Sequence, residues 1–247
     1  IGCNSIDVEA AKQRGIQVIY TPTANADSVA ELTVALFLLL QRRLYEANEG
    51  CRAGRFTSIA PRDFLGTEIL GKTFGQIGMG NIAQRIAHIM HNGFGVKVLG
   101  YDPFIDAEEA ARRGFEKVDT MEELLERSDM VNINVPLVPS TKGMISRAMF
   151  DHFKPGAVFV NAARGAVIDE DALYDALVSG KLKAAACDTF VNEPPTGENK
   201  LLSLPNFSAT PHIGGNTVEA LEKAGMEVVT ETLRVLNGEK PIHPVHL

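Results

Sequence analysis

The sequence predicts an α/β protein built on a doubly wound parallel sheet. From Gly71 onward, short apolar runs rich in β-branched residues alternate with segments of helical periodicity, the pattern of consecutive βαβ units. A glycine-rich turn joins the first of these runs to the first helical segment. The chain has 247 residues, 45% of them apolar, which is enough for one large core or two modest ones.

Six segments are predicted as strands and six as the helices between and after them. The strands are Thr73–Ile77, Lys97–Tyr101, Met130–Val135, Ala157–Asn161, Leu182–Cys187 and Phe207–Thr210. The helices are Ile82–Met90, Ala107–Arg113, Met121–Glu126, Arg147–His152, Asp169–Ser179 and Val218–Leu236.

A second, smaller unit is suggested by the residues before the βαβ series. A long helix is predicted over Val29–Asn48, and Pro61–Gly66 predicts a loop between that helix and the first strand. The strand-like run Ile16–Ile19 precedes the long helix and stands apart from the series. We expect the final helix, Val218–Leu236, to return to this unit.

Composition and charge favour a small-molecule partner. The net charge is −7 and the basic residues are scattered, which argues against a nucleic-acid or anionic membrane surface. Cys3, Cys51 and Cys187 form no CxxC pair and have no histidine at ligand spacing, so we expect no disulfide framework and no metal site. Reduced thiols of this kind predict a cytoplasmic protein.

No segment predicts membrane insertion or secretion. The longest apolar run, Leu32–Leu40, is far shorter than the roughly 18 residues of a membrane-spanning helix and is expected to be buried. The chain opens at Ile1 without Met, and its first residues lack the basic head and apolar core of a signal peptide. We expect it to begin inside a longer protein.

The glycine-rich turn predicts a dinucleotide site. Gly78, Gly80 and Ala83 form a Gly-x-Gly-x-x-Ala fingerprint between a strand and a helix, where tight turning and close backbone approach would admit a pyrophosphate. Asp102 ends the next strand, at the spacing of the acid that binds the adenosine ribose, and its charge would repel a 2′-phosphate. The alternatives are a glycine turn without ligand and an Asp102 that only begins a turn at Pro103. Together the two features predict a Rossmann-type sheet that binds NAD.

Three ionisable residues are candidates for catalysis. Arg164, Glu193 and His212 each follow the carboxyl end of a different predicted strand, and in an open α/β sheet that edge lines the ligand crevice. Taken singly, each also has a structural interpretation: a charge before a helix, a turn residue before Pro194, and a structural histidine whose hydrogen bonds are satisfied. Their shared position predicts one site.

The segments around these residues carry a family resemblance. Asn161–Gly165, Asp188–Pro194 and Thr210–Gly215 resemble, in order, the three signatures of the D-isomer-specific 2-hydroxyacid dehydrogenases. Phe64–Glu68 and Glu193-Pro194 look most like the D-3-phosphoglycerate dehydrogenases. Glyoxylate or hydroxypyruvate reductases and D-lactate dehydrogenases remain open, whereas formate dehydrogenases have a glutamine where this chain has Glu193.

The resemblance implies a role for each candidate. His212 would take the proton of the substrate hydroxyl, since a free imidazole titrates near neutral pH, and Glu193 would orient the ring. Arg164 would hold the substrate's carboxylate and carbonyl oxygen by charge-assisted hydrogen bonds. Further cofactor-binding residues implied by the resemblance are Asn81, Ile82, Pro136, Thr141, Ala162, Asp188 and Gly215, in addition to Gly78, Gly80 and Asp102.

The resemblance also implies domains and partners. Residues 28–213 would form the NAD-binding domain, residues 1–27 the remnant of a flavodoxin-like substrate domain, and residues 214–247 a C-terminal helix returning to that domain. The substrate would be a small 2-hydroxy or 2-oxo acid, and the protein would be a homodimer. The alternative from another class is a non-catalytic NAD-sensing module of the same fold.

Overall fold

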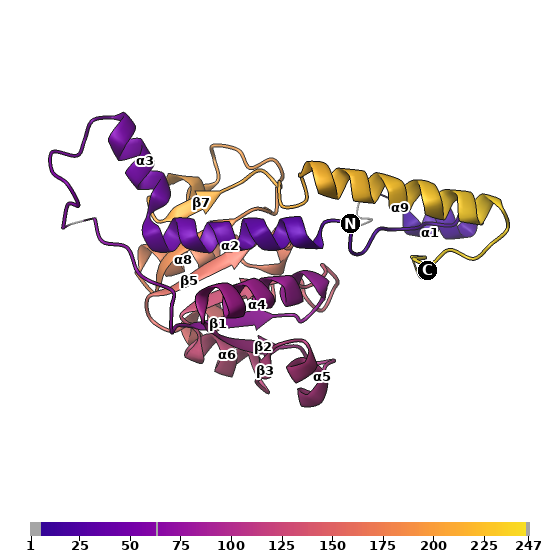
Figure 1. Cartoon of the computed structure of the whole chain (residues 1–247), viewed down its shortest axis with the longest axis horizontal. Helices are drawn as coiled ribbons and strands as arrows, with labels where there is room; N and C mark the ends of the chain where they lie inside the picture. The colour runs from indigo at the N-terminus through magenta and orange to yellow at the C-terminus, as the bar shows by residue number, and fades with distance from the viewer. Residues whose placement is uncertain (1–5, 63, 246–247) are drawn as a thin grey trace. The chain divides into compact units, whose positions relative to one another are not determined.

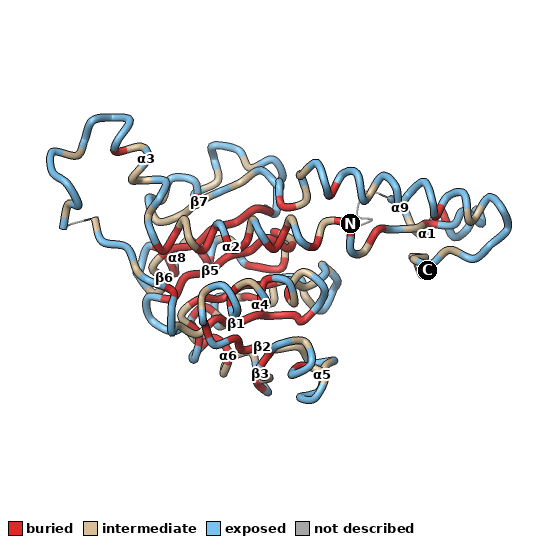
Figure 2. The backbone as a smooth tube through the Cα atoms, viewed as in Figure 1, coloured by how far each residue is buried: buried red, intermediate tan, exposed pale blue. Residues whose placement is uncertain are grey.

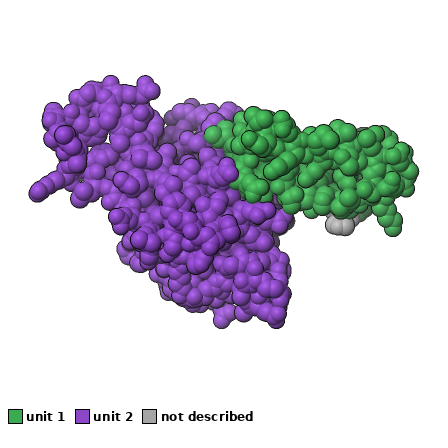
Figure 3. Space-filling view, in the orientation of Figure 1, with its two compact units in different colours: residues 1–29, 213–247 green, residues 30–212 purple. Residues whose placement is uncertain are grey.

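The computed structural model describes residues 6–62 and 64–245. Close packing divides the chain into two units, one formed by Ala30–His212 and the other by the residues up to Val29 and from Ile213 onward (Figure 3). Cys3 lies outside the described residues. Among the residues that are described, no helix has the length and apolar character needed to cross a bilayer.

The Ala30–His212 unit contains one parallel sheet, in the order β3-β2-β1-β4-β5-β6-β7 (Figure 1). This confirms the doubly wound fold and all six expected strands. The strands are β1 (Thr73–Ile77), β2 (Lys97–Tyr101), β3 (Glu116–Lys117), β4 (Met130–Ile133), β5 (Ala157–Asn161), β6 (Leu182–Cys187) and β7 (Phe207–Ala209). The additional strand, β3, is two charged residues at the sheet edge, so it has no apolar pattern by which to be recognised.

Helices cover both faces of this sheet. They are α2 (Ala26–Arg42), α4 (Asn81–Phe94), α5 (Ala107–Arg112), α6 (Met121–Arg127), α7 (Arg147–His152) and α8 (Glu170–Val178). A further helix, α3 (Leu44–Arg52), follows α2, and the 3₁₀ turns are η1 (Gly165–Val167) and η2 (Lys200–Ser203). Side chains of α6, α7 and α8 share one core cluster with the sheet, and those of α2, α4 and α5 share another. Figure 2 shows the buried backbone concentrated in the strands between these layers.

The strands are apolar on both sides because both faces are covered. In β5, Val158 and Val160 belong to the α2–α4 cluster, whereas Phe159 between them belongs to the α6–α8 cluster. All three are fully buried. The continuous apolar runs in the sequence are therefore the direct result of burial on two sides.

The expected long helix over Val29–Asn48 is wrong, because the chain breaks at Arg43. Arg43 has a left-handed backbone with φ of 52°, and it separates α2 from α3. α2 buries Phe37 and Leu40 against the sheet, but Leu44 is 51% exposed and Tyr45 is 62% exposed. The helix thus ends where its contact with the core ends. The described residues of Pro61–Gly66 form no helix or strand, as expected.

The other unit contains α1 (Val8–Gln13) and α9 (Val218–Leu236). Asp7 caps α1 by accepting a hydrogen bond from Ala10 N at 2.8 Å, and Thr217 caps α9 through Ala220 N at 3.1 Å.

The expected strand Ile16–Ile19 is reduced to a single bridge between Ile19 and Pro244. Two backbone hydrogen bonds flank it, from Tyr20 N to His243 O at 3.2 Å and from Val245 N to Val18 O at 2.9 Å. In this unit the segment after α9, rather than the helix alone, returns to the early residues.

We predict that Phe159→Ala destabilises the fold by about 3–5 kcal/mol, the usual cost of deleting a buried phenyl group. The Phe159 ring lies edge-on to those of Phe150 and Phe153, with ring centroids 6.1 and 5.6 Å away. Urea unfolding would measure the change in the free energy of unfolding. The matched control is Phe104→Ala, where the side chain is 94% exposed and the change should stay within about 0.5 kcal/mol. Equal effects in the two variants would contradict the assignment of this core.

Candidate active site

The carboxyl ends of β5, β6 and β7 lie side by side at one edge of the sheet. The register pairs Asn161 with Cys187 and Cys187 with Ala209, so the three strands end level with one another. Arg164, Glu193 and His212 stand in the loops that leave these ends. The structure thus brings the three predicted catalytic residues to the same edge.

Glu193 and His212 form a direct pair. Glu193 Oε2 lies 2.9 Å from His212 Nδ1, and Glu193 Oε1 accepts a hydrogen bond from Phe190 N at 3.0 Å. Since a carboxylate only accepts, the pairing places a proton on Nδ1 and leaves Nε2 of a neutral ring free to accept another. The His212 side chain is 46% exposed, so the ring is open to a ligand.

The backbone of His212 is held in a conformation that histidine rarely adopts. Its φ is 57°, in the left-handed region that costs an L-residue roughly 1–2 kcal/mol. His212 N donates to Asp188 O at 2.8 Å, and Thr210 Oγ1 donates to Asp188 Oδ1 at 2.6 Å. These bonds join the ends of β6 and β7 and fix the start of the His212 loop. Thr210 was not predicted as a site residue; its place at the carboxyl end of the predicted strand Phe207–Thr210 was the available signal.

Arg164 stands in a short loop fixed by a second unpredicted residue, Asn161. The buried Asn161 side chain donates to Arg164 O and accepts from Ala163 N, both at 3.0 Å. Arg164 Nη1 donates to Ala163 O at 2.7 Å. Among the described contacts, Arg164 makes no hydrogen bond or ion pair with Glu193 or His212. Its guanidinium therefore keeps donors for a ligand.

Gly165 brings the Arg164 loop against the Glu193 loop. A Cβ atom added at Gly165 would lie 1.9 Å from Phe190 C and 2.4 Å from Val191 N. No side chain fits there, so glycine is required by the close approach of the two backbones.

Cys187, at the end of β6, lies close to this site but has an unreactive thiol. Burial raises the pKa of its thiol, and the Glu170 and Asp188 carboxylates raise it further. The group stays a protonated thiol and is a poor nucleophile.

The turn formed by Gly78–Gly80 between β1 and α4, named the phosphate turn below, has the geometry that the fingerprint predicts. Gly78 has a φ of 83°, and its N donates to Tyr101 O at 2.8 Å. A Cβ atom there would lie 2.4 Å from Asn134 O. Gly80 is the N-cap of α4 and no side chain caps the helix; an added Cβ at Gly80 would meet no described atom within 4 Å. The α4 N-terminus is therefore open to an anion.

Asp102 is fixed beside this turn. Its Oδ2 accepts a hydrogen bond from Met79 N at 3.1 Å, and its Oδ1 accepts from Phe104 N at 3.0 Å. Each oxygen keeps a lone pair, so the carboxylate can also accept from two ribose hydroxyls. Arg113 Nη1 donates to Met79 O at 2.9 Å from the other side of the turn, a contact that sequence reasoning did not foresee.

The remaining predicted cofactor residues occupy the same edge, with one exception. Asn81 and Ile82 begin α4, and the Thr141 hydroxyl donates to Pro136 O at 2.6 Å, which closes the loop after β4. Ala162 and Asp188 are buried where β5 and β6 end. The exception is Gly215, which belongs to the other unit, where an added Cβ would lie 2.9 Å from Asn25 Nδ2.

The open N-terminus of α4 and the Asp102 carboxylate beside it together fit a dinucleotide. The turn gives a pyrophosphate unobstructed access to backbone N–H groups, and the first turn of α4 carries no acidic side chain that would repel it. Other helices of this unit, such as α5, α6 and α8, are capped by Asp106, Thr120 and Asp169 and have acidic first turns.

Comparison with known proteins identifies the family to which the chain belongs. The family model for the D-isomer specific 2-hydroxyacid dehydrogenase NAD binding domain matches residues 34–214. D-3-phosphoglycerate dehydrogenase from Methanocaldococcus jannaschii is 43% identical over 239 residues, which are 97% of this chain and 45% of that protein. Hydroxypyruvate reductase from Thermotoga maritima is 44% identical over 238 residues, 96% of this chain and 75% of that protein.

A solved structure shows the same arrangement. D-lactate dehydrogenase with NAD⁺ from Lactobacillus jensenii gives a TM-score of 0.86 at 30% identity, over 100% of this chain and 77% of that one. The chain therefore spans about three quarters of that relative, and less than half the length of the M. jannaschii protein.

We predict that Asp102→Arg reverses a preference for NAD over NADP, and that Asp102→Ser narrows it. Two like charges about 4 Å apart repel by about 1–4 kcal/mol between the dielectric of water and that of a protein surface, which corresponds to roughly five- to 10³-fold in affinity. Fluorescence titration with NADH and NADPH measures both affinities. Asp106→Ser, at a nearby helix cap, is the control. A wild-type protein that binds both cofactors equally would contradict the role of Asp102.

Proposed function

The chain belongs to the D-isomer specific 2-hydroxyacid dehydrogenase family, and from that premise we propose that it oxidises a small D-2-hydroxy acid with NAD, or reduces the 2-oxo acid in reverse. The observation that carries the proposal is the Glu193–His212 pair, 2.9 Å apart, at the sheet edge where the phosphate turn also lies. In this proposal His212 is the base, Glu193 orients it, Arg164 binds the substrate, and the three lie at the sheet edge that carries the dinucleotide site.

The proton of the substrate hydroxyl passes to His212 in this scheme. Bound NAD supplies the hydride acceptor for the C2 hydrogen. His212 Nε2 takes the hydroxyl proton, and the Glu193 carboxylate at Nδ1 stabilises the imidazolium that results. In the reduction direction, the protonated ring returns the proton to the oxygen of the 2-oxo acid.

Arg164 binds the acid group in the same scheme. Its planar guanidinium can hold a carboxylate through two parallel hydrogen bonds, which fixes the orientation of the carbon beside it. The Asn161 side chain fixes the Arg164 backbone, and Gly165 allows the Arg164 loop to touch the Glu193 loop. Substrate clamp and base thus belong to one packed set of loops.

For the substrate we propose a short D-2-hydroxy acid, with 3-phosphoglycerate as the first to test. The M. jannaschii relative and several others are named D-3-phosphoglycerate dehydrogenase, whereas the T. maritima relative is named hydroxypyruvate reductase. A panel of 3-phosphoglycerate, hydroxypyruvate, glyoxylate and pyruvate, followed by NADH absorbance, separates these possibilities. NADH binding without turnover on any of them would favour an NAD-sensing module instead.

We also propose that residues 1–27 and 214–247 belong to a flavodoxin-like substrate domain and residues 28–213 to the NAD-binding domain. Pairing of the C-terminal segment with Val18–Tyr20 supports a common unit for the two chain ends. α9 carries exposed apolar side chains, Val218, Leu221, Leu233 and Leu236 among them, as expected of a helix that packs within a larger domain.

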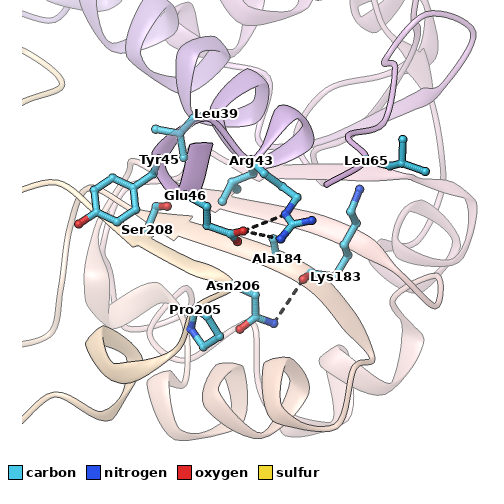
Figure 4. A pocket seen from close by; sticks show the side chains of 11 residues that line it. Leu39, Arg43, Tyr45, Glu46, Leu65, Lys183, Ala184, Pro205, Asn206 and Ser208 are labelled. Carbon is cyan, nitrogen blue, oxygen red and sulfur yellow. Dashed lines mark hydrogen bonds and ion pairs between the residues drawn. The ribbon is translucent and has the colours of Figure 1, made fainter. Parts of the chain in front are cut away.

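A homodimer through α3 and the loop after it completes the proposal. Figure 1 shows α3 and that loop extending away from the sheet, and their large apolar side chains are exposed: Leu44, Tyr45, Ile59 and Leu65. Figure 4 shows a pocket beside them, lined by Tyr45, Leu65 and the starts of β6 and β7. It lies at the amino ends of the strands, opposite the catalytic edge, so a second copy could dock there without covering His212.

We predict that His212→Gln lowers turnover by on the order of 10²- to 10⁴-fold, the usual contribution of a general base, and leaves NADH affinity unchanged. The matched control is His152→Gln, since His152 Nδ1 also lies 2.9 Å from a glutamate, Glu126, but on α7, away from the site. Turnover is measured on the best acid of the panel, and NADH affinity by fluorescence. If His212→Gln kept nearly full turnover, His212 would not be the base.

We predict a dimeric mass by light scattering at micromolar concentration, and a monomeric mass for Tyr45→Glu combined with Leu65→Glu. A charge placed in an apolar interface must be desolvated, which opposes association. Phe104→Glu is the control and should remain dimeric, because this phenyl group is also exposed but lies in the loop after β2, away from α3. A monomeric wild-type chain would refute the proposed interface.

A further inference from the structure

Glu170, the first residue of α8, uses both of its carboxylate oxygens to hold loops beside the catalytic pair. Its Oε1 accepts a hydrogen bond from Val191 N at 2.7 Å, and its Oε2 accepts from Asn199 Nδ2 at 3.0 Å. Asn199 in turn caps η2 by accepting from Leu201 N at 3.0 Å. One side chain thus connects α8, the loop after β6 and the start of η2.

The loop that Glu170 holds is the one that carries Glu193. Val191 N, bound by Glu170, belongs to the residue directly after Phe190, whose own N–H is bound by Glu193 at 3.0 Å. The peptide that Glu170 binds is joined at the Phe190 Cα to the preceding peptide, whose N–H donates to Glu193, so Glu170 restrains the residue against which the Glu193 carboxylate is aligned. The other oxygen of that carboxylate faces His212.

The same peptide touches the Arg164 loop. A Cβ at Gly165 would lie 2.3 Å from Phe190 O and 2.4 Å from Val191 N, so the backbone after Arg164 packs directly on this peptide. Glu170 lies five residues after Gly165, beyond η1, and belongs to the Arg164 side of the contact. The hydrogen bond from Val191 N to Glu170 therefore ties the Arg164 loop to the loop that carries Glu193, the partner of His212.

We propose that Glu170 is a positioning residue for the reaction, setting the Glu193–His212 pair relative to Arg164. The inference rests on the proposed dehydrogenase function. The hydrogen bonds that the structure describes for the Glu170 side chain go to Val191 and Asn199 and not to the phosphate turn or Asp102, so we expect its effect in the catalytic half of the site. A carboxylate is suited to the task because hydrogen bonds to an ionised acceptor are stronger than neutral ones and two donors can share it.

The test compares Glu170→Ala with Asp171→Ala. Asp171 is the next carboxylate in the same first turn of α8, is 77% exposed and pairs only with Lys200 at 3.2 Å among the described residues, so the two variants change the helix charge equally. For Glu170→Ala we expect kcat to fall on the order of ten- to 10²-fold, the cost of misplacing a catalytic group by up to about 1 Å, with NADH affinity unchanged. Asp171→Ala should keep the wild-type kcat.

The pH profile separates positioning from a general structural role. In the oxidation direction His212 must be unprotonated, and a less well aligned Glu193 stabilises the imidazolium less, so the acid limb of kcat/KM should move to lower pH in Glu170→Ala. Glu170→Gln keeps an oxygen that can accept from Val191 N and should recover most of the lost turnover. Glu170→Asp keeps the charge but shortens the side chain by one methylene. It replaces Glu170→Ala in the same measurements if that variant does not fold.

A double-mutant cycle with Glu193→Gln completes the experiment. If Glu170 acts through Glu193, its removal should cost little further turnover once Glu193 is replaced. Additive losses, an unmoved acid limb, or equal losses in Glu170→Ala and Asp171→Ala would each overturn the proposal. A wild-type chain that binds NADH but turns over no acid of the panel would refute the proposed function and this role with it, whereas an active wild type with an unaffected Glu170→Ala would refute this role alone.

Discussion

The parallel register of the sheet is the constraint on which the rest of the site depends. Backbone ladders pair β1 with β2 and β4, and then β4 to β7 in sequence. Because all strands run in the same direction, every carboxyl end reaches the same edge. A shift of one residue in any ladder would turn a strand's buried side chains to the opposite face, where the other helix layer lies. Core packing and site geometry are therefore specified together.

Two glycines let backbones approach where this edge needs them closest. Gly78 packs against Asn134 O, which brings the phosphate turn close to the loop after β4. Gly165 packs against the Phe190–Val191 peptide. In both places the obstacle to a side chain is backbone, which cannot move aside as a flexible side chain can. The nucleotide half and the catalytic half of the site use the same means of fixing a loop.

Carboxylates also fix the loops at this edge, by accepting hydrogen bonds from them. Asp102, Glu170 and Glu193 each accept at least one backbone N–H from a loop, and Asp188 accepts the Thr210 hydroxyl. Hydrogen bonds to charged groups contribute roughly 1.5–3 kcal/mol each, enough to order segments that have no regular secondary structure of their own. An acid anchored through one oxygen still has the other for chemistry. Glu193 is the clearest case, since Phe190 N holds Oε1 while Oε2 meets His212.

Sequence patterns were sufficient wherever burial on two faces or a local turn left a signature. The apolar runs predict the positions of six strands, the glycine spacing locates the phosphate turn, and parallel topology places Arg164, Glu193 and His212 at one edge. β3 was not predicted because its two charged residues form no apolar periodicity.

What only the tertiary structure decided depends on partners distant in the chain. The helix break at Arg43 follows from where α2 loses contact with the sheet, which helix propensity does not report. The roles of Thr210 and Glu170 rest on groups in other segments: Asp188 Oδ1 lies 22 positions from Thr210, and Val191 N lies 21 positions from Glu170. Side-chain identity shows that a residue can accept or donate a hydrogen bond, but folding alone determines which backbone group lies within reach.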